Sequence, residues 1–538
     1  MREGLQTHTT HIATTGGSIS KSHGRSFNFN TQQLLSWKRT FANDHNVSVL
    51  LGHEYYRATT VSLGASKSVL FSMENLELNG AVKDNQGANS SKDWYNNEGF
   101  FGRAQYDYQN RIFVSASYRR DASSRFHPDH RWGSFWSIGG GWIINEEAWF
   151  NAPWIDMLKL KASYGSQGND SISNYLYTDT YGIGSYDGGI SITPGSKGNP
   201  NLTWETNGNF NAGVDFGFWR NRLSGSFEYF YRKTTDMIYF FSVPPSLGYG
   251  GYYDNVGDMR NAGVEFAINA NVMQRRNLNW NVYVNATHYR NKVLLIPERN
   301  KTMNVSGHAG YASGDKFIGE GLSLFTFYIP EYAGVDKTNG LPLYFVDVLN
   351  DKNEVIGRET TTAYNEATDY LCGDPTPDLY GGFGTNLEFY GFDVALAFTY
   401  QIGGLVYDSG YASLMTPPSA STGSNFHKDV KKAWSLDNPN SDIPRFFYMD
   451  TEAGATSSRW LTDASYLNFQ NAQIGYTIPA KYTQRIKVSK IRVYVSADNI
   501  CYVSRRKGLD PRQSFTGATS SALNSPVRTV SGGLSVTF

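Results

Sequence analysis

The stretch Leu379–Ile402, LYGGFGTNLEFYGFDVALAFTYQI, contains the pattern that decides the fold. Apolar residues occupy alternate positions in its second half, namely Phe392, Val394, Leu396 and Phe398. Successive side chains of a strand point to opposite faces, so this period of two predicts a β-strand with one apolar face. Only Tyr390-Gly391 separates the second half of the stretch, 392–402, from the first half, 379–389, and so short a link predicts a hairpin.

The same alternation recurs along the chain, at 212–218, 264–272 and 491–495. An apolar face of this kind packs on a second sheet in a soluble sandwich and faces lipid in a membrane barrel. Many segments run for about 10 to 13 residues, longer than the usual soluble strand and close to the length that crosses a bilayer at a tilt. Segment length therefore favours the membrane barrel.

The lengths of the connections support the same choice. Short links also occur at Gln109-Asn110 and Arg220-Asn221, whereas long stretches separate the hairpins at 58–97, 166–205, 234–260, 291–378, 403–462 and 500–527. Short turns on one side and long loops on the other are typical of outer-membrane barrels. We predict an all-β, antiparallel up-and-down transmembrane β-barrel of about 16 strands, with short periplasmic turns, long extracellular loops and a first strand within 5–15. The loop 291–378 is expected to contain small sheets of its own.

Composition is consistent with this fold and narrows the function. Aromatic residues make up 15% of the 538 residues, and two girdles at lipid–water boundaries would accommodate such an excess. The net charge of zero indicates no nucleic-acid partner. Apolar runs stay well short of the roughly 18 residues of a transmembrane helix. Met1–Gly17 contains no signal peptide, so we expect a trimmed chain or one that starts inside a longer gene.

Several local features interrupt the alternation. The apolar phase shifts within 463–477, which predicts a β-bulge near Gln470. The stretch 145–154 is interpreted as a short helix or irregular turn. Cys372 and Cys501 lie far apart in the sequence, and whether they pair stays open. The histidines near the N-terminus, His8, His11 and His23, are interpreted as polar decoration of a strand rather than as a metal site.

An ordered series of motifs carries a family resemblance. The stretches FFGRAQY at 100–106, SYRRDASSRF at 117–126, LKASYGSQGND at 160–170, NPNLTWE at 199–205, NVGDMRNAGVE at 255–265 and PTPDLYGG at 375–382 follow one another in order. In this series the chain resembles the SusC/RagA-like branch of TonB-dependent outer-membrane transporters. The resemblance covers about residues 95–538 clearly and 20–57 more weakly.

The resemblance implies a location, an activity and partners. Members have a signal peptide, a TonB box, a plug domain and a barrel of about 22 strands. Of these four parts, only barrel strands match this sequence. Residues 1–538 are therefore expected to be one partial barrel domain of a multi-pass protein of the bacterial outer membrane. The implied activity is TonB-dependent import of oligosaccharides, with oligopeptides second. A SusD-like surface lipoprotein and TonB–ExbB–ExbD, reached through a missing N-terminal part, are the implied partners.

Two other functions remain open from the residues alone. One is a passive porin-like channel, since an even number of about 16 strands could close without a plug. The other is a secreted all-β glycan-binding protein or glycosidase. No catalytic, metal-binding or cofactor-binding residues stand out, so we expect no enzyme and no cofactor.

Aromatic residues in the expected extracellular loops are candidates for ligand contact, since flat rings stack on sugars and hold peptides. They are Trp94, Tyr95, Tyr249, Tyr252 and Tyr253. Loop packing or a place in the aromatic girdle is the alternative for each. The charged runs at 119–121 and 123–125 are interpreted as rim packing, and the basic run 505–507 as loop solvation or contact with lipopolysaccharide.

The C-terminal strand has one apolar face, formed by Val530, Leu534, Val536 and Phe538. An alternating strand that ends in an aromatic residue resembles the signal read by the barrel-assembly machinery. The alternative is an ordinary edge strand that happens to end in phenylalanine, although such an edge would promote aggregation of a soluble protein. We expect this strand to run inward to the periplasm and its outer edge to lack its native partner.

Overall fold

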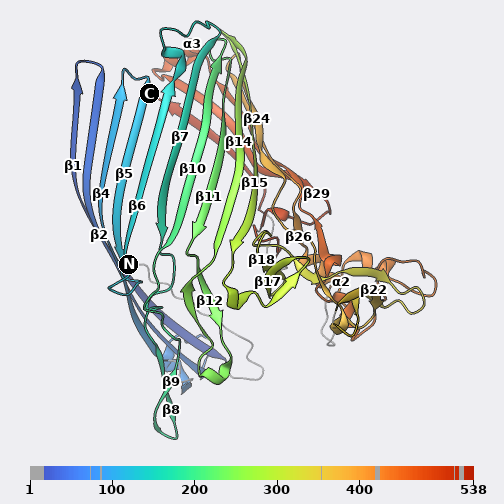
Figure 1. Cartoon of the computed structure of the whole chain (residues 1–538). Helices are drawn as coiled ribbons and strands as arrows, with labels where there is room; N and C mark the ends of the chain where they lie inside the picture. Colours follow the sequence, from blue (N-terminus) through green and yellow to red (C-terminus); the bar gives the residue numbers. More distant parts are fainter. Residues whose placement is uncertain are drawn as a thin grey trace. The chain divides into compact units, whose positions relative to one another are not determined.

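The computed structural model describes residues 17–72, 74–84, 88–352, 354–418, 425–513, 515–519 and 526–538 (Figure 1). The strand expected within 5–15, with His8 and His11, lies outside the described residues. The chain divides into two compact units. The first comprises 1–140, 164–207 and 236–256, and the second comprises 141–163, 208–235 and 257–538.

The largest sheet is antiparallel, and its strand order is β1-β2-β4-β5-β6-β7-β10-β11-β14-β15-β24-β25-β28-β29-β30. With β3, which pairs with β2, the sheet has 16 strands, as the sequence predicted. Its strands are β1 (Ser18–Phe41), β2 (His45–Leu70), β3 (Ala81–Asp84), β4 (Asn89–Tyr108), β5 (Ile112–Ser123), β6 (Trp132–Ile143), β7 (Ile155–Asn169), β10 (Glu205–Phe218), β11 (Leu223–Thr235), β14 (Asp258–Arg275), β15 (Leu278–Leu295), β24 (Leu379–Phe389), β25 (Phe392–Ile402), β28 (Tyr466–Thr477), β29 (Lys490–Ser504) and β30 (Thr529–Thr537).

The predicted hairpins are confirmed. β24 and β25 pair from Leu379↔Ile402 to Phe389↔Phe392, and both linking residues have positive φ, 48° at Tyr390 and 91° at Gly391. Positive φ at both positions gives the turn a twist that matches the twist of the strands. The other two predicted links also have positive φ, and β1 and β2 form one more tight hairpin at residues 42–44.

The predicted loop 58–97 is wrong in extent. β2 continues to residue 70 and β4 begins at residue 89, so only 71–88 connects the two strands. The β2 extension keeps an exposed apolar face with Val61 and Leu63, whereas the β4 extension is largely polar, and the backbones of both pair with neighbouring strands. For example, Val61 pairs with Arg25 of β1 and with Lys92 of β4. Backbone pairing does not require an apolar face, so the polar run 89–93 of β4 has no alternation. In β2, Val61, Leu63 and Ala65 do alternate with small residues, and this signal for a strand was missed.

The β-bulge near Gln470 is confirmed. Ala397 pairs with Asn471 and the next residue, Phe398, pairs with Phe469, which leaves Gln470 without an opposing residue. On the N-terminal side of this extra residue, odd-numbered rather than even-numbered side chains of β28 point to the apolar face. The Phe398 and Phe469 rings therefore stack on one face, with their centroids 4.5 Å apart.

The sheet has one apolar face, and its side chains are exposed. On the β29–β30 hairpin, Val493 and Leu534 oppose each other and are 48% and 67% exposed. Contiguous exposed apolar surface of this kind marks contact with a membrane or a partner rather than a water-facing surface. Within the described residues, β30 has a strand neighbour only in β29, and β1 only in β2.

Short elements occupy the long connections. In the first unit they are β8 (Tyr181–Tyr186), β9 (Gly189–Pro194), β12 (Ile238–Ser242) and β13 (Gly251–Asn255). In the second they include β16 (Met303–Val305), β17 (His308–Ser313), β18 (Lys316–Gly319), β19 (Tyr328–Pro330), β20 (Tyr332–Val335), β21 (Pro342–Leu349), β22 (Val355–Thr361), β23 (Asp369–Leu371), β26 (Leu405–Tyr407), α2 (Ser409–Met415), β27 (Leu461–Asp463) and α3 (Ala480–Thr483). The small sheets expected within 291–378 are therefore present. A 3₁₀ turn at Ile144–Glu146 confirms the irregular segment near 145–154.

Two further details concern the cysteines and the helices. Cys372 and Cys501 are both free thiols. Among the described residues, no helix has the length and apolar character needed to cross a membrane.

Candidate functional site on the long loops

The long loops of the first unit share a small apolar core, which we call the anchor core. Phe126, Phe135, Leu202 and Trp204 form it, and Ile238 and Tyr253 pack against it. The Trp204 ring lies 5.4 Å from the rings of Phe126 and Phe135, and its Nε1 donates to the Arg131 carbonyl oxygen. These contacts join residues that follow β5, precede β10 and form β12 and β13.

Asp170 is a second junction between these segments. Its Oδ2 accepts hydrogen bonds from the Tyr95 hydroxyl and the Ser123 hydroxyl, both at 2.7 Å. Arg125 donates to the Asp170 carbonyl oxygen at 2.8 Å, and its guanidinium lies 4.4 Å from the centre of the Tyr95 ring. These internal contacts agree with the rim-packing interpretation of the run 123–125.

Glu205 and Asn255 tie loop 170–204 to loop 236–257. The Glu205 carboxylate accepts from Asn169 Nδ2 at 2.6 Å and from the Ile238 backbone N–H at 2.8 Å. The Asn255 side chain accepts from the Thr203 N–H at 2.7 Å and donates to the Thr203 carbonyl at 2.9 Å. Several of the motif residues that carried the family resemblance in this unit, such as Asp170, Trp204 and Asn255, therefore act as loop anchors.

A cavity of about 410 Å³ lies beside the anchor core. Arg119, Asp121, Gln167 and Trp204 are among the residues that line it. Asp121 and Trp204 are buried, and Arg119 Nε donates to both carboxylate oxygens of Asp121. Charged and amide groups next to a flat ring can bind the hydroxyl groups of a sugar or the backbone of a peptide. Reasoning from the sequence had not singled out Gln167, because it lies inside a motif that we took as structural.

The five aromatic candidates differ in their surroundings. Trp94 and Tyr95 lie in β4 and not in a loop, since they pair with Thr59 and Ala58 of β2. Trp94 is 43% exposed, whereas the Tyr95 hydroxyl is bound by Asp170. Tyr252 and Tyr253 lie in β13, and their rings pack on Phe241 and Phe240 respectively. Tyr249 lies just before this strand and is half-buried.

The β8–β9 hairpin has an exposed apolar face that the sequence reading missed. Tyr181, Ile183, Ile190 and Ile192 share this face and are 63% to 84% exposed. The turn Asp187-Gly188 has positive φ at both positions and is a sequence signal for a hairpin. Together with the alternating isoleucines, this turn could have been recognised.

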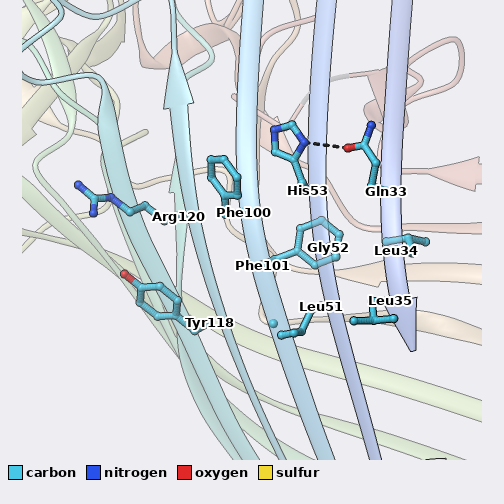
Figure 2. Close-up of a pocket in the computed structure, with 11 residues that line it drawn as sticks. Gln33, Leu34, Leu35, Leu51, Gly52, His53, Phe100, Phe101, Tyr118 and Arg120 are labelled. Atoms are coloured by element: carbon cyan, nitrogen blue, oxygen red, sulfur yellow. Dashed lines mark hydrogen bonds between the residues drawn. The ribbon is translucent and has the colours of Figure 1, made fainter. Parts of the chain in front are cut away.

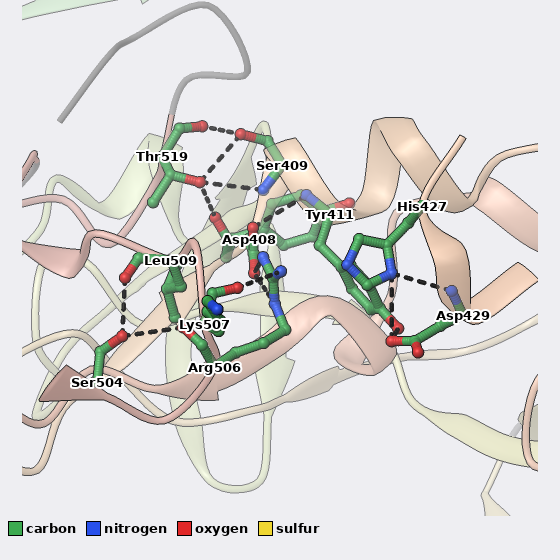
Figure 3. A network of polar contacts seen from close by, with 11 residues as sticks. Asp408, Ser409, Tyr411, His427, Asp429, Ser504, Arg506, Lys507, Leu509 and Thr519 are labelled. Carbon is green, nitrogen blue, oxygen red and sulfur yellow. Dashed lines mark hydrogen bonds and ion pairs between the residues drawn. The ribbon is translucent and has the colours of Figure 1, made fainter. Parts of the chain in front are cut away.

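The loops of the second unit are anchored by a buried ion pair (Figure 3). Asp408 is 5% exposed, and its carboxylate caps α2 and accepts a 2.8 Å hydrogen bond from Arg506 Nε. The Arg506 guanidinium lies 4.3 Å from the centre of the Tyr411 ring, and the Tyr411 hydroxyl donates to Asp429. Arg506 is thus an internal anchor and not a solvated loop residue, while Arg505 and Lys507 are exposed.

A second cation of these loops lies among aromatic rings. The Arg459 guanidinium is 4.3 Å from the Trp460 ring and 5.4 Å from the Tyr332 ring, and it donates to the Ala453 carbonyl oxygen. Burial lowers the pKa of Arg459 and raises the pKa of Tyr332 to about 12. Within the part of the chain that the structure describes, no group of three or more His, Cys, Asp or Glu could hold a metal ion.

Comparison with known proteins identifies the family. The family model for the β-barrel of TonB dependent receptor-like proteins matches residues 4–347. The chain belongs to the TonB-dependent receptor-like β-barrel family. It is therefore an outer-membrane protein, and its short turns and long loops are periplasmic and extracellular, respectively.

Individual relatives agree with this assignment. The TonB-dependent receptor P3 of Formosa agariphila is 27% identical over 95% of this chain, and the TonB-dependent receptor SusC of Bacteroides thetaiotaomicron is 26% identical over 77%. These matches cover 51% and 41% of the two relatives, so the chain spans about half the length of the curated relatives it matches. Among solved structures, the RagAB peptide transporter matches with a TM-score of 0.83 and 25% identity, covering 97% of this chain and 56% of that one. The SusC/RagA-like resemblance of the motifs is thereby confirmed.

Proposed function

We propose that residues 1–538 form the barrel wall of a SusC-like importer of large nutrients that TonB energises. The observation that carries this proposal is the cavity lined by Arg119, Asp121 and Gln167, next to loops that are tied together by the anchor core. A site for large solutes requires loops held in a fixed arrangement around accessible polar groups, and Gln167 is such a group. TonB–ExbB–ExbD would act through parts of the protein outside this chain.

Oligosaccharides are the proposed cargo class. Gln167 is exposed and Arg119 is half-buried in this cavity, so their amide and guanidinium groups are available to the hydroxyl groups of a sugar. Oligopeptides are the second candidate, and the similarity to the RagAB peptide transporter favours them. Family membership, which points to receptors and transporters, supports import over the glycosidase and glycan-binding alternatives.

A substitution in the cavity tests this assignment. Gln167→Ala is expected to lower uptake of the cargo severalfold, because one amide that binds the cargo is lost. Gln105→Ala is the matched control, because Gln105 lies in the same sheet and does not line the cavity. Uptake of labelled oligosaccharides and oligopeptides by cells that carry each variant is the measurement. Equal uptake with the two variants would argue against the cavity as a cargo site.

We also propose that a SusD-like lipoprotein binds the exposed face of the β8–β9 hairpin. Two apolar side chains near its tip, Ile183 and Ile190, are more than 80% exposed, and a partner surface would remove them from water. The double substitution Ile183→Ser with Ile190→Ser is expected to reduce copurification of the lipoprotein. Ser191→Ala with Thr193→Ala changes the opposite face and is the control. Unchanged copurification with the first variant would contradict this proposal.

A further inference from the structure

The outward face of β1, β2 and β4 changes character along the strands (Figure 2). Towards the periplasmic turn it is apolar, with Leu35 opposite Leu51. One step further along this face, His53 Nδ1 donates to Gln33 Oε1 at 2.8 Å, and the His53 ring stacks on Phe100 with centroids 4.5 Å apart. A change from aliphatic to aromatic and polar side chains is what a lipid–water boundary requires. The outer edge of the lipid-facing belt therefore lies near His53.

The same face continues beyond this boundary on the extracellular side. A groove of about 520 Å³ follows there, and its lining includes Arg25, Phe27, Phe29, Tyr55, Arg57 and Lys92. Register places them on the lipid-facing side, because the positions in each strand differ from Gln33, His53 and Phe100 by even numbers. With about 3.3 Å per residue and a tilt of about 40°, Phe29 lies roughly 10 Å and Arg25 roughly 20 Å above the boundary.

The cations of this groove have no acidic partner. Arg25, Arg57 and Lys92 are exposed, and none of the three forms an ion pair with any residue that the structure describes. By contrast, Arg119 of β5, on the other face of the sheet, is paired with Glu54 of β2 at 3.1 Å. The acid nearest to the groove on its own face, Glu98, already contacts His53 Nε2 at 3.1 Å. The groove is therefore positively charged.

We propose that this groove binds the anionic headgroup of lipopolysaccharide in the outer leaflet. The guanidinium and ammonium groups would pair with its phosphates and acidic sugars, and Phe27, Phe29 and Tyr55 would pack against the sugar rings. Two observations favour this occupant over a soluble partner. The groove is continuous with the lipid-facing surface, and its charge is complementary to a headgroup at that height. The inference rests on the outer-membrane location and is independent of the import proposal.

Lipid A binding to the purified, detergent-solubilised protein tests the inference. The variant carries Arg25→Gln, Arg57→Gln and Lys92→Gln, and the probes are bis-phosphorylated lipid A, its dephosphorylated form and inorganic phosphate. Each cation near an anionic lipid surface contributes about fivefold in affinity, so the triple variant is expected to bind lipid A at least tenfold more weakly. Dephosphorylated lipid A is expected to bind the unmodified protein as weakly as lipid A binds the variant.

A matched variant controls for the loss of charge. Lys38→Gln, Arg103→Gln and Lys352→Gln remove the same charge from the opposite face of β1 and β4 and from the turn between β21 and β22. This control is expected to bind lipid A like the unmodified protein. Equal binding by the groove variant would overturn the inference, and so would inorganic phosphate binding as tightly as lipid A. The comparison of lipid A with its dephosphorylated form uses the unmodified protein only, so it tests the inference even if the triple variant fails to fold.

Discussion

Arg492 on β29 pairs with Asp393 on β25, although β28 lies between these two strands. Arg492 Nε donates to Asp393 Oδ1 at 2.9 Å, and its Nη2 donates to the second carboxylate oxygen. The ion pair crosses β28 at Gly475, where a Cβ atom would lie 2.6 Å from Arg492 Nη2 and from both carboxylate oxygens. A glycine on the middle strand thus leaves the space through which the two charges meet.

The first unit repeats this arrangement. Arg119 on β5 reaches Glu54 on β2 across Gly99 of β4, with Nη2 and Oε2 3.1 Å apart. A Cβ at Gly99 would lie 2.9 Å from the same Nη2 and 2.2 Å from Asp121 Oδ1. The polar face of the sheet therefore links alternate strands through charges that pass over glycines.

Gly475→Ala is expected to destabilise the sheet by about 1 to 3 kcal/mol, because the new methyl group displaces the Arg492–Asp393 pair. Gly532→Ala on β30 is the control, since the atom nearest to its added Cβ is 4.0 Å away. Heat-modified migration on gels measures the unfolding temperature of each variant. An equal temperature for both variants would show that the glycine is not required for the pair.

Asp170→Ala is expected to loosen loop 170–204. Two hydroxyl groups, of Tyr95 and Ser123, would lose their acceptor, and each half-buried donor left unsatisfied costs about 1 to 3 kcal/mol. Hydrogen exchange of the loop amides should accelerate at least tenfold. Asp129→Ala removes a carboxylate that is 78% exposed, and exchange should stay unchanged. If both variants exchange alike, Asp170 is not a loop anchor.

Lys316 predicts a pH dependence in the loop 296–378. Burial lowers the pKa of Lys316 to about 8 from its ordinary value of 10.5, and its Nζ lies 3.0 Å from the centre of the Phe327 ring. The unfolded loop binds more protons between these two pH values, so its stability rises as pH increases from about 8 to 10.5. Lys316→Met should slow proteolysis of this loop about tenfold at pH 7 and much less at pH 10. The control is Lys352→Met, an exposed lysine for which no effect is expected. A slowing by Lys316→Met that is the same at both pH values would contradict this reasoning.

Phe538→Ala is expected to lower the amount of folded protein in the outer membrane severalfold. Phe538 ends the apolar face that includes Val536 and Leu534, and we propose that the barrel-assembly machinery reads this face. Thr537→Ala alters the opposite face of β30 and should leave the amount unchanged. Quantitative blots of outer-membrane fractions provide the comparison. An equal loss with both variants would point to a general effect of the C-terminus rather than to a signal.

Period-two patterns made the membrane strands and their tight turns predictable from the sequence. The hairpin at Tyr390-Gly391 and the bulge at Gln470 depend on neighbouring residues only, so the sequence located both to the residue. The extension of β2 through 58–70 was predictable in principle, since Val61, Leu63 and Ala65 alternate there. The extension of β4 through 89–97 was not predictable, because backbone pairing with adjacent strands holds a largely polar segment. The same limit placed Trp94 and Tyr95 in a loop.

The candidate site was harder to predict because it depends on how separate strands line up. Tyr95, Ser123 and Asp170 meet only after β4, β5, β6 and β7 adopt their register, and no spacing in the sequence indicates that meeting. Aromatic residues identified the β12–β13 hairpin as a region of interest. The presence of aromatic residues did not show that Tyr253 packs against the anchor core, and it did not point to the polar cavity that Gln167 lines.

Uptake of a panel of fluorescent oligosaccharides and oligopeptides tests the central claim most directly. Cells that produce the protein should be compared with and without TonB, at equal amounts of folded protein in the outer membrane. The import proposal predicts uptake of at least one member of the panel that requires both the protein and TonB. Uptake that needs the protein but persists unchanged without TonB would contradict it and indicate a passive channel.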